Sequence, residues 1–365
     1  MLKLGTGKSS LHTLVQIAIL LGSLYLFLLS IDLLGSAMRL FGEGFAETLI
    51  ASTSNPLVGL FIGILCTSVV QSSSLTTSIV VGLVGSNALT IASAIPIIMG
   101  ANIGTSVTNM LVSLAHLNRS AEFRRSFAAA NVHDFFNFLS VLALFPLQHY
   151  TNFLGHTAHA MAELFQNAGG LTLFNPLKAA TAPAAACLCA AARNPWLLLV
   201  IALALLFFAL RQLVRVLKAL VVAKTGSWFD KFLFKHQFRA FVVGLLLTVL
   251  AQSSSITTSL VIPLCGAGLL SLRQIFPYTL GANIGTTVTA ILASMVTANP
   301  SAVTVAFAHL LFNVIGTAVW WPLQKVPVYL ADTFAAYAVR NRIFPIAYIF
   351  AMFFVIPLIV ILTLN

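Results

Sequence analysis

The chain contains Gln71-Ser72-Ser73-Ser74-Leu75-Thr76-Thr77-Ser78 and repeats it, 181 residues later, as Gln252-Ser253-Ser254-Ser255-Ile256-Thr257-Thr258-Ser259. At the same offset, Gly100-Ala101-Asn102-Ile103-Gly104-Thr105 returns as Gly281-Ala282-Asn283-Ile284-Gly285-Thr286. Hydroxyl and amide groups are costly in an apolar protein unless they find partners. A duplicated polar cluster with interrupted hydrophobic segments therefore predicts a site that binds a transported solute.

The composition indicates a membrane protein. Hydrophobic residues make up 59% of the chain and charged residues only 7%, whereas soluble domains carry about 25% charge. Seven weakly charged segments approach or exceed the roughly 20 residues that span a bilayer: 14–36, 88–116, 127–147, 196–222, 270–297, 301–322 and 343–364. We therefore predict an all-α polytopic membrane protein, with residues 1–365 forming a single transmembrane domain.

The net charge of +11 does not indicate nucleic-acid binding. The basic residues flank the apolar spans, where anionic lipid and membrane topology account for them. We therefore expect the lipid bilayer, and not a nucleic acid, as the large partner of the basic surface.

Two further apolar segments, about 54–87 and 240–269, are interrupted by the Gln-Ser-Ser-Ser clusters. Each half is too short to span a bilayer alone, which predicts two re-entrant helical hairpins. Serine is a favoured N-cap, so each cluster should begin the second half-helix. The hairpins divide the chain into repeat 1 (14–147), an external connection (148–195), repeat 2 (196–322) and an additional C-terminal helix (343–364).

Equivalent loops of the two repeats differ in charge. Arg119, Arg124 and Arg125 follow the 88–116 span, whereas only Ala298-Asn299-Pro300 follows the equivalent span of repeat 2. Because cytoplasmic loops are rich in Lys and Arg, the repeats should have inverted topology, as in many secondary transporters. The basic stretches 211–239 and 325–342 and the N-terminus are then cytoplasmic. A parallel duplication is the alternative.

The repeated cluster has the chemistry of an anion site. Serine hydroxyls and the free N–H groups of a helix N-terminus donate to anion oxygens. Neither Ser/Thr segment carries a basic residue, so we expect binding without an arginine. Hydroxyl lone pairs and amide carbonyls also suit a hard cation such as Na⁺. The predicted substrate-binding residues are Gln71, Ser72, Ser73, Ser74, Gln252, Ser253, Ser254 and Ser255.

Other interpretations of these polar residues stay open. Ser and Thr also pack helices against one another in membranes, and Asn102 and Asn283 could form interhelical bonds. His133 and Asn137 share one helix face, as do His309 and Asn313; packed histidines would explain them. Asp134 lies inside a span and could pair with the nearby arginines, Arg124 and Arg125.

The duplicated motifs resemble those of the type II sodium/phosphate cotransporter family, over about residues 14–322. The resemblance implies Na⁺-coupled movement of inorganic phosphate by alternating access in the plasma (inner) membrane, with both hairpins forming the site. No cofactor is expected apart from Na⁺ as coupling ion, and no transition metal. The expected sodium-binding residues are Gln71, Thr76, Thr77, Asn102, Thr105, Gln252, Thr257, Thr258, Asn283 and Thr286.

Different functions remain as alternatives. Within transport, the solute could be another oxyanion, or phosphate could be exported; an anion channel is a further possibility. A membrane-embedded enzyme would use a serine of the first cluster as nucleophile and His133 or His309 as base. The symmetric clusters, with no acid duplicated beside either His, argue against an enzyme. The oligomeric state stays open.

Overall fold

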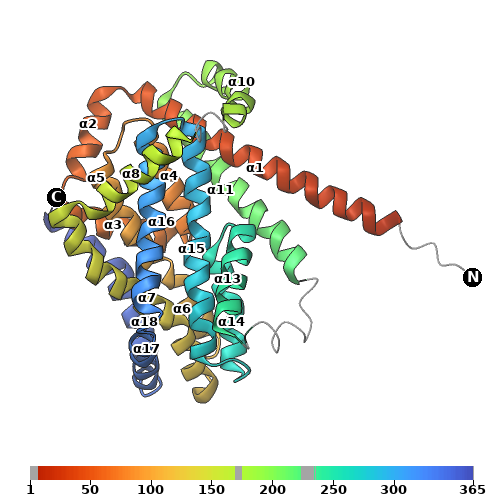
Figure 1. The fold of residues 1–365 in the computed structure, drawn as a ribbon, viewed down its shortest axis with the longest axis vertical. Coiled ribbons are helices and arrows are strands. Elements are labelled where there is room, and N and C mark those ends of the chain that lie inside the picture. Colours follow the sequence, from red (N-terminus) through yellow and green to blue (C-terminus); the bar gives the residue numbers. More distant parts are fainter. Residues whose placement is uncertain (1–6, 169–174, 223–233, 235, 365) are drawn as a thin grey trace, which may run out of the picture.

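The computed structural model describes residues 7–168, 175–222, 234 and 236–364, and within these ranges every regular element is a helix (Figure 1). Seven helical segments are long and apolar enough to cross a membrane: Val15–Phe41, Ile91–Leu114, Ser120–Thr151, Pro195–Gln212, Leu272–Thr297, Pro300–Trp320 and Ile343–Leu364. They coincide with the seven predicted spans. The prediction of an all-α polytopic membrane protein is confirmed.

The helices of the two repeats follow the same order around each hairpin. Repeat 1 contains α1 (Gly7–Phe41), α2 (Glu43–Ser52), α3 (Pro56–Val70), α4 (Ser73–Gly85), α5 (Ile91–Gly104), α6 (Ser106–Leu114) and α7 (Ser120–Thr151). Repeat 2 contains α11 (Pro195–Val222), α13 (Gln237–Ala251), α14 (Ser254–Gly266), α15 (Leu272–Thr297) and α16 (Pro300–Trp320). The continuous helix α15 corresponds to the pair α5 and α6.

Segments that the sequence suggested as connections are largely helical. They form α2, α8 (Phe153–Asn167), α10 (Asn175–Ala191) and α17 (Lys325–Ala338); the chain ends with α18 (Ile343–Phe350), η1 (Ala351–Val355) and α19 (Ile356–Leu364). The helix axis bends by 96° between α2 and α3. α17 buries a stripe of alanines and exposes Tyr329 and Tyr337, so a search for long apolar windows misses it. Lys224, Lys231 and Lys235 of the predicted basic stretch lie outside the described residues.

Both predicted hairpins are helix–break–helix units with the same backbone geometry. Gln71 ends α3 in the left-handed region (φ 56°, ψ 31°), and Ser72 is extended. Gln252 (φ 51°, ψ 26°) and Ser253 repeat these conformations. The left-handed region is costly for a residue other than glycine. Its occurrence at both equivalent positions shows that the repeated sequence specifies this turn.

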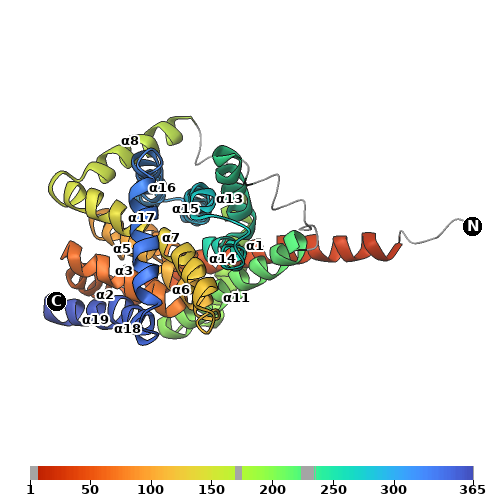
Figure 2. The ribbon, with the colours of Figure 1, turned by 90° about the horizontal axis from the view of Figure 1, so that it is seen from below.

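Paired glycines bring the first helix of each hairpin into backbone contact with the following span. A Cβ atom on Gly63 or Gly100 would overlap a carbonyl oxygen of the facing helix, and the equivalent Gly244 and Gly281 repeat this contact. Membrane helices lack a hydrophobic driving force between them and rely on such close packing. The Gly-Ala-Asn-Ile-Gly-Thr element therefore holds α5 against α3 and α15 against α13. Figure 2 shows α7 between these two pairs.

The second helices of the two hairpins end at opposite ends of α15. The amide of Asn299, just beyond the end of α15, donates to the Gly85 carbonyl at the end of α4 (3.0 Å). α14 is joined to the start of α15 by a short turn. α15 has 26 residues and is about 39 Å long, whereas α4 and α14 have 13 residues each. Together, the two half-helices therefore match the length of one full span.

We predict that Gly100→Ala and Gly281→Ala each destabilise the protein by about 1–3 kcal/mol, because the methyl group forces two packed backbones apart. The unfolding midpoint of the purified protein in detergent should fall by several degrees. Gly22→Ala is the control, since a Cβ on Gly22 meets nothing within 4 Å. Equal midpoints for all three variants would contradict the close approach.

Candidate functional site

A cavity of about 270 Å³ lies where the two hairpin tips meet. We call it the tip cavity. Both hairpins contribute, together with α6 and α11; the lining residues are Val70, Gln71, Ser72, Leu75, Thr108, Phe207, Leu210, Arg211, Gln252, Ser253, Ser255 and Ile256. Five of the eight predicted substrate-binding residues are among them. The remaining three, Ser73, Ser74 and Ser254, are buried and are not in the lining.

The two tips are in direct contact through the residues at the breaks. The Ser74 hydroxyl in the first turn of α4 donates to the Gln252 carbonyl at the end of α13 (2.8 Å). Ser72 and Ser253 each accept one N–H of the helix that they cap, from Leu75 (3.2 Å) and Ile256 (3.4 Å). Two helix N-termini with their partial positive charge thus begin beside one cavity, an arrangement that favours an anion.

Arg211 of α11 also lines the tip cavity, whereas the sequence led us to expect a site without an arginine. That expectation considered the hairpins alone, and only the tertiary packing brings α11 beside them. One signal in the sequence could have revealed it: Arg211 is the first cation at the end of an otherwise apolar span, and an ionisable residue in a span is a candidate for function. A guanidinium binds phosphate oxygens in bidentate geometry.

The threonines predicted to bind sodium form a buried layer behind the tips. Thr67 donates to the Thr76 hydroxyl (3.0 Å), and Thr258 donates to the Asn109 side chain (3.0 Å). The other hydroxyls donate to carbonyls of their own helices: Thr76 and Thr257 to Ser72 and Ser253, Thr77 to Ser74, and Thr105 and Thr286 to Ala101 and Ala282. These hydroxyls donate their protons within the protein, so their oxygen lone pairs could face a cation.

The two asparagines of the repeated Gly-Ala-Asn-Ile-Gly-Thr element bind across the repeats. The Asn283 side chain of α15 accepts through its oxygen from the His133 ring of α7 (2.7 Å) and donates through its nitrogen to the Asn137 side chain (2.9 Å). Asn313 of α16 donates to the Asn102 side chain of α5 (3.3 Å). These residues are all buried and are not in the lining of the tip cavity. The interhelical bonds that the sequence left as an alternative are therefore present.

Equivalent hydroxyls of the two hairpin regions are in different bonding states. Thr289 donates to the Gln252 side chain (2.7 Å), whereas its equivalent, Thr108, has no hydrogen-bond partner among the described residues. The Thr67 hydroxyl donates to the Thr76 hydroxyl, whereas the hydroxyl of its equivalent, Thr248, has no hydrogen-bond partner in the part of the chain that the structure describes.

The histidines of the two His-x-x-x-Asn elements differ in the same way. Both ring nitrogens of His133 are bonded, to Ser106 (3.2 Å) and Asn283 (2.7 Å). Neither nitrogen of His309 has a partner in the part of the chain that the structure describes. The sequence repeats have thus folded into two similar halves with different polar contacts.

Asp134 does not pair with the neighbouring arginines. Its carboxylate accepts from the Tyr348 hydroxyl (3.0 Å). Arg124 pairs with Asp332 of α17 (3.0 Å), and Arg125 donates to the Gly266 carbonyl (2.8 Å). The pairing suggested from sequence proximity is therefore wrong, because α17 and α14 pack against the start of α7 and supply other partners.

Two capped hairpins that meet at one cavity, in a chain whose described residues include seven apolar spans, are the architecture of a membrane transport protein. The family model described as Na⁺/Pi-cotransporter matches residues 26–174 and 205–337. The chain belongs to this family, as the motifs indicated, and it is a transporter and not an enzyme.

Curated relatives agree with this family. Sodium-dependent phosphate transport protein 2A of sheep (Ovis aries) is 35% identical over 428 residues, which cover 94% of this chain and 67% of the relative. The 2A protein of rat (Rattus norvegicus) is 34% identical with the same coverage. The human 2B protein is 32% identical over 94% of this chain and 64% of its own length. No solved structure matches the chain.

Proposed function

We propose that the protein moves inorganic phosphate together with Na⁺ across the membrane, and that phosphate binds in the tip cavity. The observation that carries this proposal is the meeting of both Gln-Ser-Ser-Ser breaks at one cavity. Phosphate presents acceptor oxygens on all sides, which suits hydroxyl and backbone N–H donors that converge from two helices. We infer phosphate as the solute and Na⁺ as the coupling ion from the names of the relatives, which are sodium-dependent phosphate transport proteins.

Arg211 is the charged partner of phosphate in this proposal. The hairpin tips offer hydroxyls, amides and two helix N-termini, but no full positive charge. A guanidinium at the cavity favours the doubly charged form of phosphate over the singly charged form, because the attraction grows with the charge of the ligand. Arg211 therefore contributes both to affinity and to the choice of ionic form.

Na⁺ binds beside phosphate, at oxygens contributed by the breaks and by the threonine layer. The carbonyl oxygens of Gln71 and Gln252 and the hydroxyl oxygens of Thr76 and Thr257 are neutral ligands of the kind that hard cations prefer. A cation at this place also offsets part of the charge of the bound anion. The coupling of the two solutes follows, because each lowers the cost of burying the other.

Alternating access operates by exchange between the two halves, which have inverted topology. This proposal rests on three observations: α4 and α14 end at opposite ends of α15; equivalent loops differ in charge; and equivalent polar groups differ in bonding. In the opposite conformation Thr108 binds Gln71 and Thr289 releases Gln252. The site stays in place while the contacts of the halves are exchanged.

Uptake of labelled phosphate into proteoliposomes should require a Na⁺ gradient and stop when choline replaces Na⁺. Ser255→Ala should raise the KM for phosphate about tenfold to a hundredfold, the effect of losing a hydrogen bond to a charged ligand. Ser259→Ala is the control, because Ser259 lies one turn further along α14 and bonds the Ile256 carbonyl (2.8 Å).

Equal uptake in choline would exclude sodium coupling. Wild-type kinetics in Ser255→Ala, measured in a Na⁺ gradient, would instead exclude the tip cavity as the phosphate site.

We predict that Arg211→Gln raises the KM for phosphate at least tenfold while the dependence on Na⁺ concentration keeps its shape. Arg211→Lys should restore part of the affinity, since it keeps the charge but loses the bidentate geometry. Arg215→Gln, one turn further along α11 and outside the cavity lining, should behave as wild type. Measuring the KM between pH 6 and 8 adds a check: the preference for the doubly charged form should weaken in Arg211→Gln. Identical kinetics in the two Gln variants would refute a role for Arg211.

The inverted arrangement makes a prediction about labelling. In a background without Cys66, Cys187, Cys189 and Cys265, Pro300→Cys should react with an impermeant thiol reagent on intact cells. Ser120→Cys should react only after the cells are opened. Both positions are exposed in the structure, so accessibility within the fold does not limit either reaction. Labelling of both cysteines from the same side would argue for parallel repeats.

A further inference from the structure

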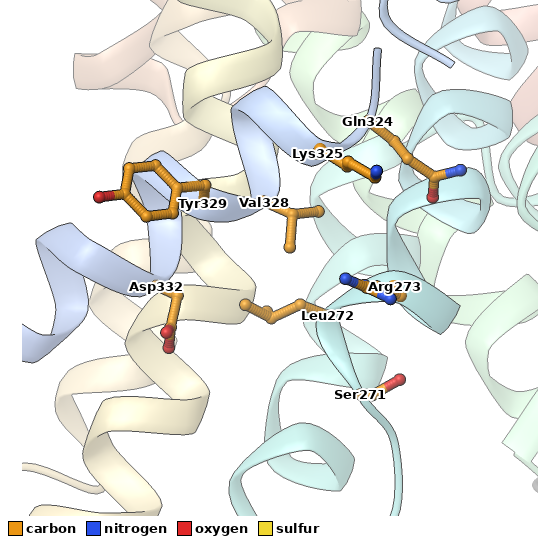
Figure 3. A pocket seen from close by; sticks show the side chains of 8 residues that line it. All are labelled: Ser271, Leu272, Arg273, Gln324, Lys325, Val328, Tyr329 and Asp332. Carbon is orange, nitrogen blue, oxygen red and sulfur yellow. The ribbon is translucent and has the colours of Figure 1, made fainter. Parts of the chain in front are cut away.

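A second cavity, of about 530 Å³, lies between the first turns of α15 and α17. It shares no lining residue with the tip cavity. Its lining consists of Ser271, Leu272, Arg273, Gln324, Lys325, Val328, Tyr329 and Asp332. Figure 3 shows Arg273 and Lys325 on the same side of this cavity, with Asp332 on the other.

The one carboxylate in the lining of this cavity does not balance its two cations. Asp332 is already paired with Arg124 of α7, at 3.0 Å. Among the residues that the structure describes, no carboxylate lies within ion-pair distance of Arg273 or Lys325.

The helix positions of both cations are also unfavourable. Arg273 and Lys325 each occupy the first turn of a helix, where the helix dipole disfavours positive charge. An anion in the cavity would compensate both side chains and both helix ends.

The lining further specifies the kind of anion. Arg273 can bind two oxygens of a phosphate group with its guanidinium, and Lys325 adds a compact positive charge. Leu272 and Val328 form apolar parts of the lining. Next to the cavity, Leu323 and Val326 expose 51% and 42% of their surfaces. A polar group flanked by apolar surface is typical of sites for lipid headgroups between membrane helices.

We propose that this cavity binds a phosphate group through Arg273 and Lys325, either that of an anionic phospholipid or free phosphate. Both cations lie at the end of the molecule where α7 begins and carries Arg124 and Arg125. This is the end that the loop charges assign to the cytoplasm, where anionic lipid is abundant. The proposal does not depend on phosphate binding in the tip cavity.

A ligand at this place would join two parts of the fold. α17 packs against α7 of repeat 1 through the Arg124–Asp332 ion pair and through the stacked rings of Phe127 and Phe334, whose centroids are 5.7 Å apart. Arg273 belongs to α15 of repeat 2. The phosphate group would therefore bridge the repeats at their basic end, and its binding would favour the conformation in which α15 and α17 are close enough to share it.

The test uses the full chain, purified in detergent without Na⁺, and measures its thermal unfolding midpoint. The probes are dioctanoyl phosphatidylglycerol, inorganic phosphate and, as a lipid control without net charge, dioctanoyl phosphatidylcholine. Phosphatidylglycerol well above its Kd should raise the midpoint by several degrees, and phosphatidylcholine should have much less effect. This shift should disappear in Arg273→Gln/Lys325→Gln and persist in Arg342→Gln, whose exposed cation lies outside the cavity.

The source of the phosphate group follows from which probe works. A shift with phosphatidylglycerol alone identifies a lipid headgroup. A shift with inorganic phosphate that survives Ser255→Ala but not the double substitution identifies free phosphate at this cavity, separate from the tip cavity. No shift with either probe, or equal shifts in wild type and double variant, would overturn the proposal. If the double variant does not fold, Lys325→Gln alone serves, with at least half of the shift expected to be lost.

Discussion

Inside a bilayer every backbone N–H and C=O group needs a partner within the protein, and the two broken helices must meet this constraint in the interior of the bundle. A break frees carbonyls at the end of one half-helix and N–H groups at the start of the next. Ser72 and Ser253 satisfy one N–H each, and Ser74 satisfies the Gln252 carbonyl of the other hairpin. Of these residues, Ser72, Gln252 and Ser253 also line the tip cavity, whereas Ser74 is buried outside its lining. The residues that complete the broken helices therefore overlap with those of the candidate site.

The surrounding packing keeps these breaks in place. The glycine contacts fix α3 on α5 and α13 on α15 at backbone distance, which leaves each half-helix little freedom to slide. The buried amides tie α15 to α7 and α5 to α16, so that each repeat is held by the other. These contacts between the repeats are made by neutral groups. Neutral groups suit the interior because the desolvation penalty of a buried ion pair can exceed the electrostatic attraction between its charges. The positive charge at the tip cavity comes from outside the hairpins, from Arg211.

Much of this fold could be predicted because its signals are local. The length of apolar segments identified the seven spans, and the interruption at Gln-Ser-Ser-Ser identified both hairpins with their caps. By contrast, α8 and α17 are short helices that bury small residues, and their sequences resemble loops between spans. Arg211, and the Tyr348 partner of Asp134, depend on contacts between distant segments. From one sequence alone, polar residues can be assigned to helices, but the contacts between residues on distant helices cannot be predicted.

The length of the half-helices α4 and α14, 13 residues each, determines how far the tip cavity lies from the two membrane faces, and hence how a membrane voltage acts on it. Each half-helix is about 20 Å long and their tips are in contact, so the tip cavity lies near the middle of the length of α15. A transmembrane voltage falls across the low-dielectric layer of the bilayer, and an ion bound in this cavity, as we propose, would cross about half of that layer from either face. The energy is about 1 kcal/mol for each elementary charge at 100 mV. Under the proposed binding of ions in the tip cavity, its occupancy would depend on voltage through the position of the break, even though no charged side chain has to move.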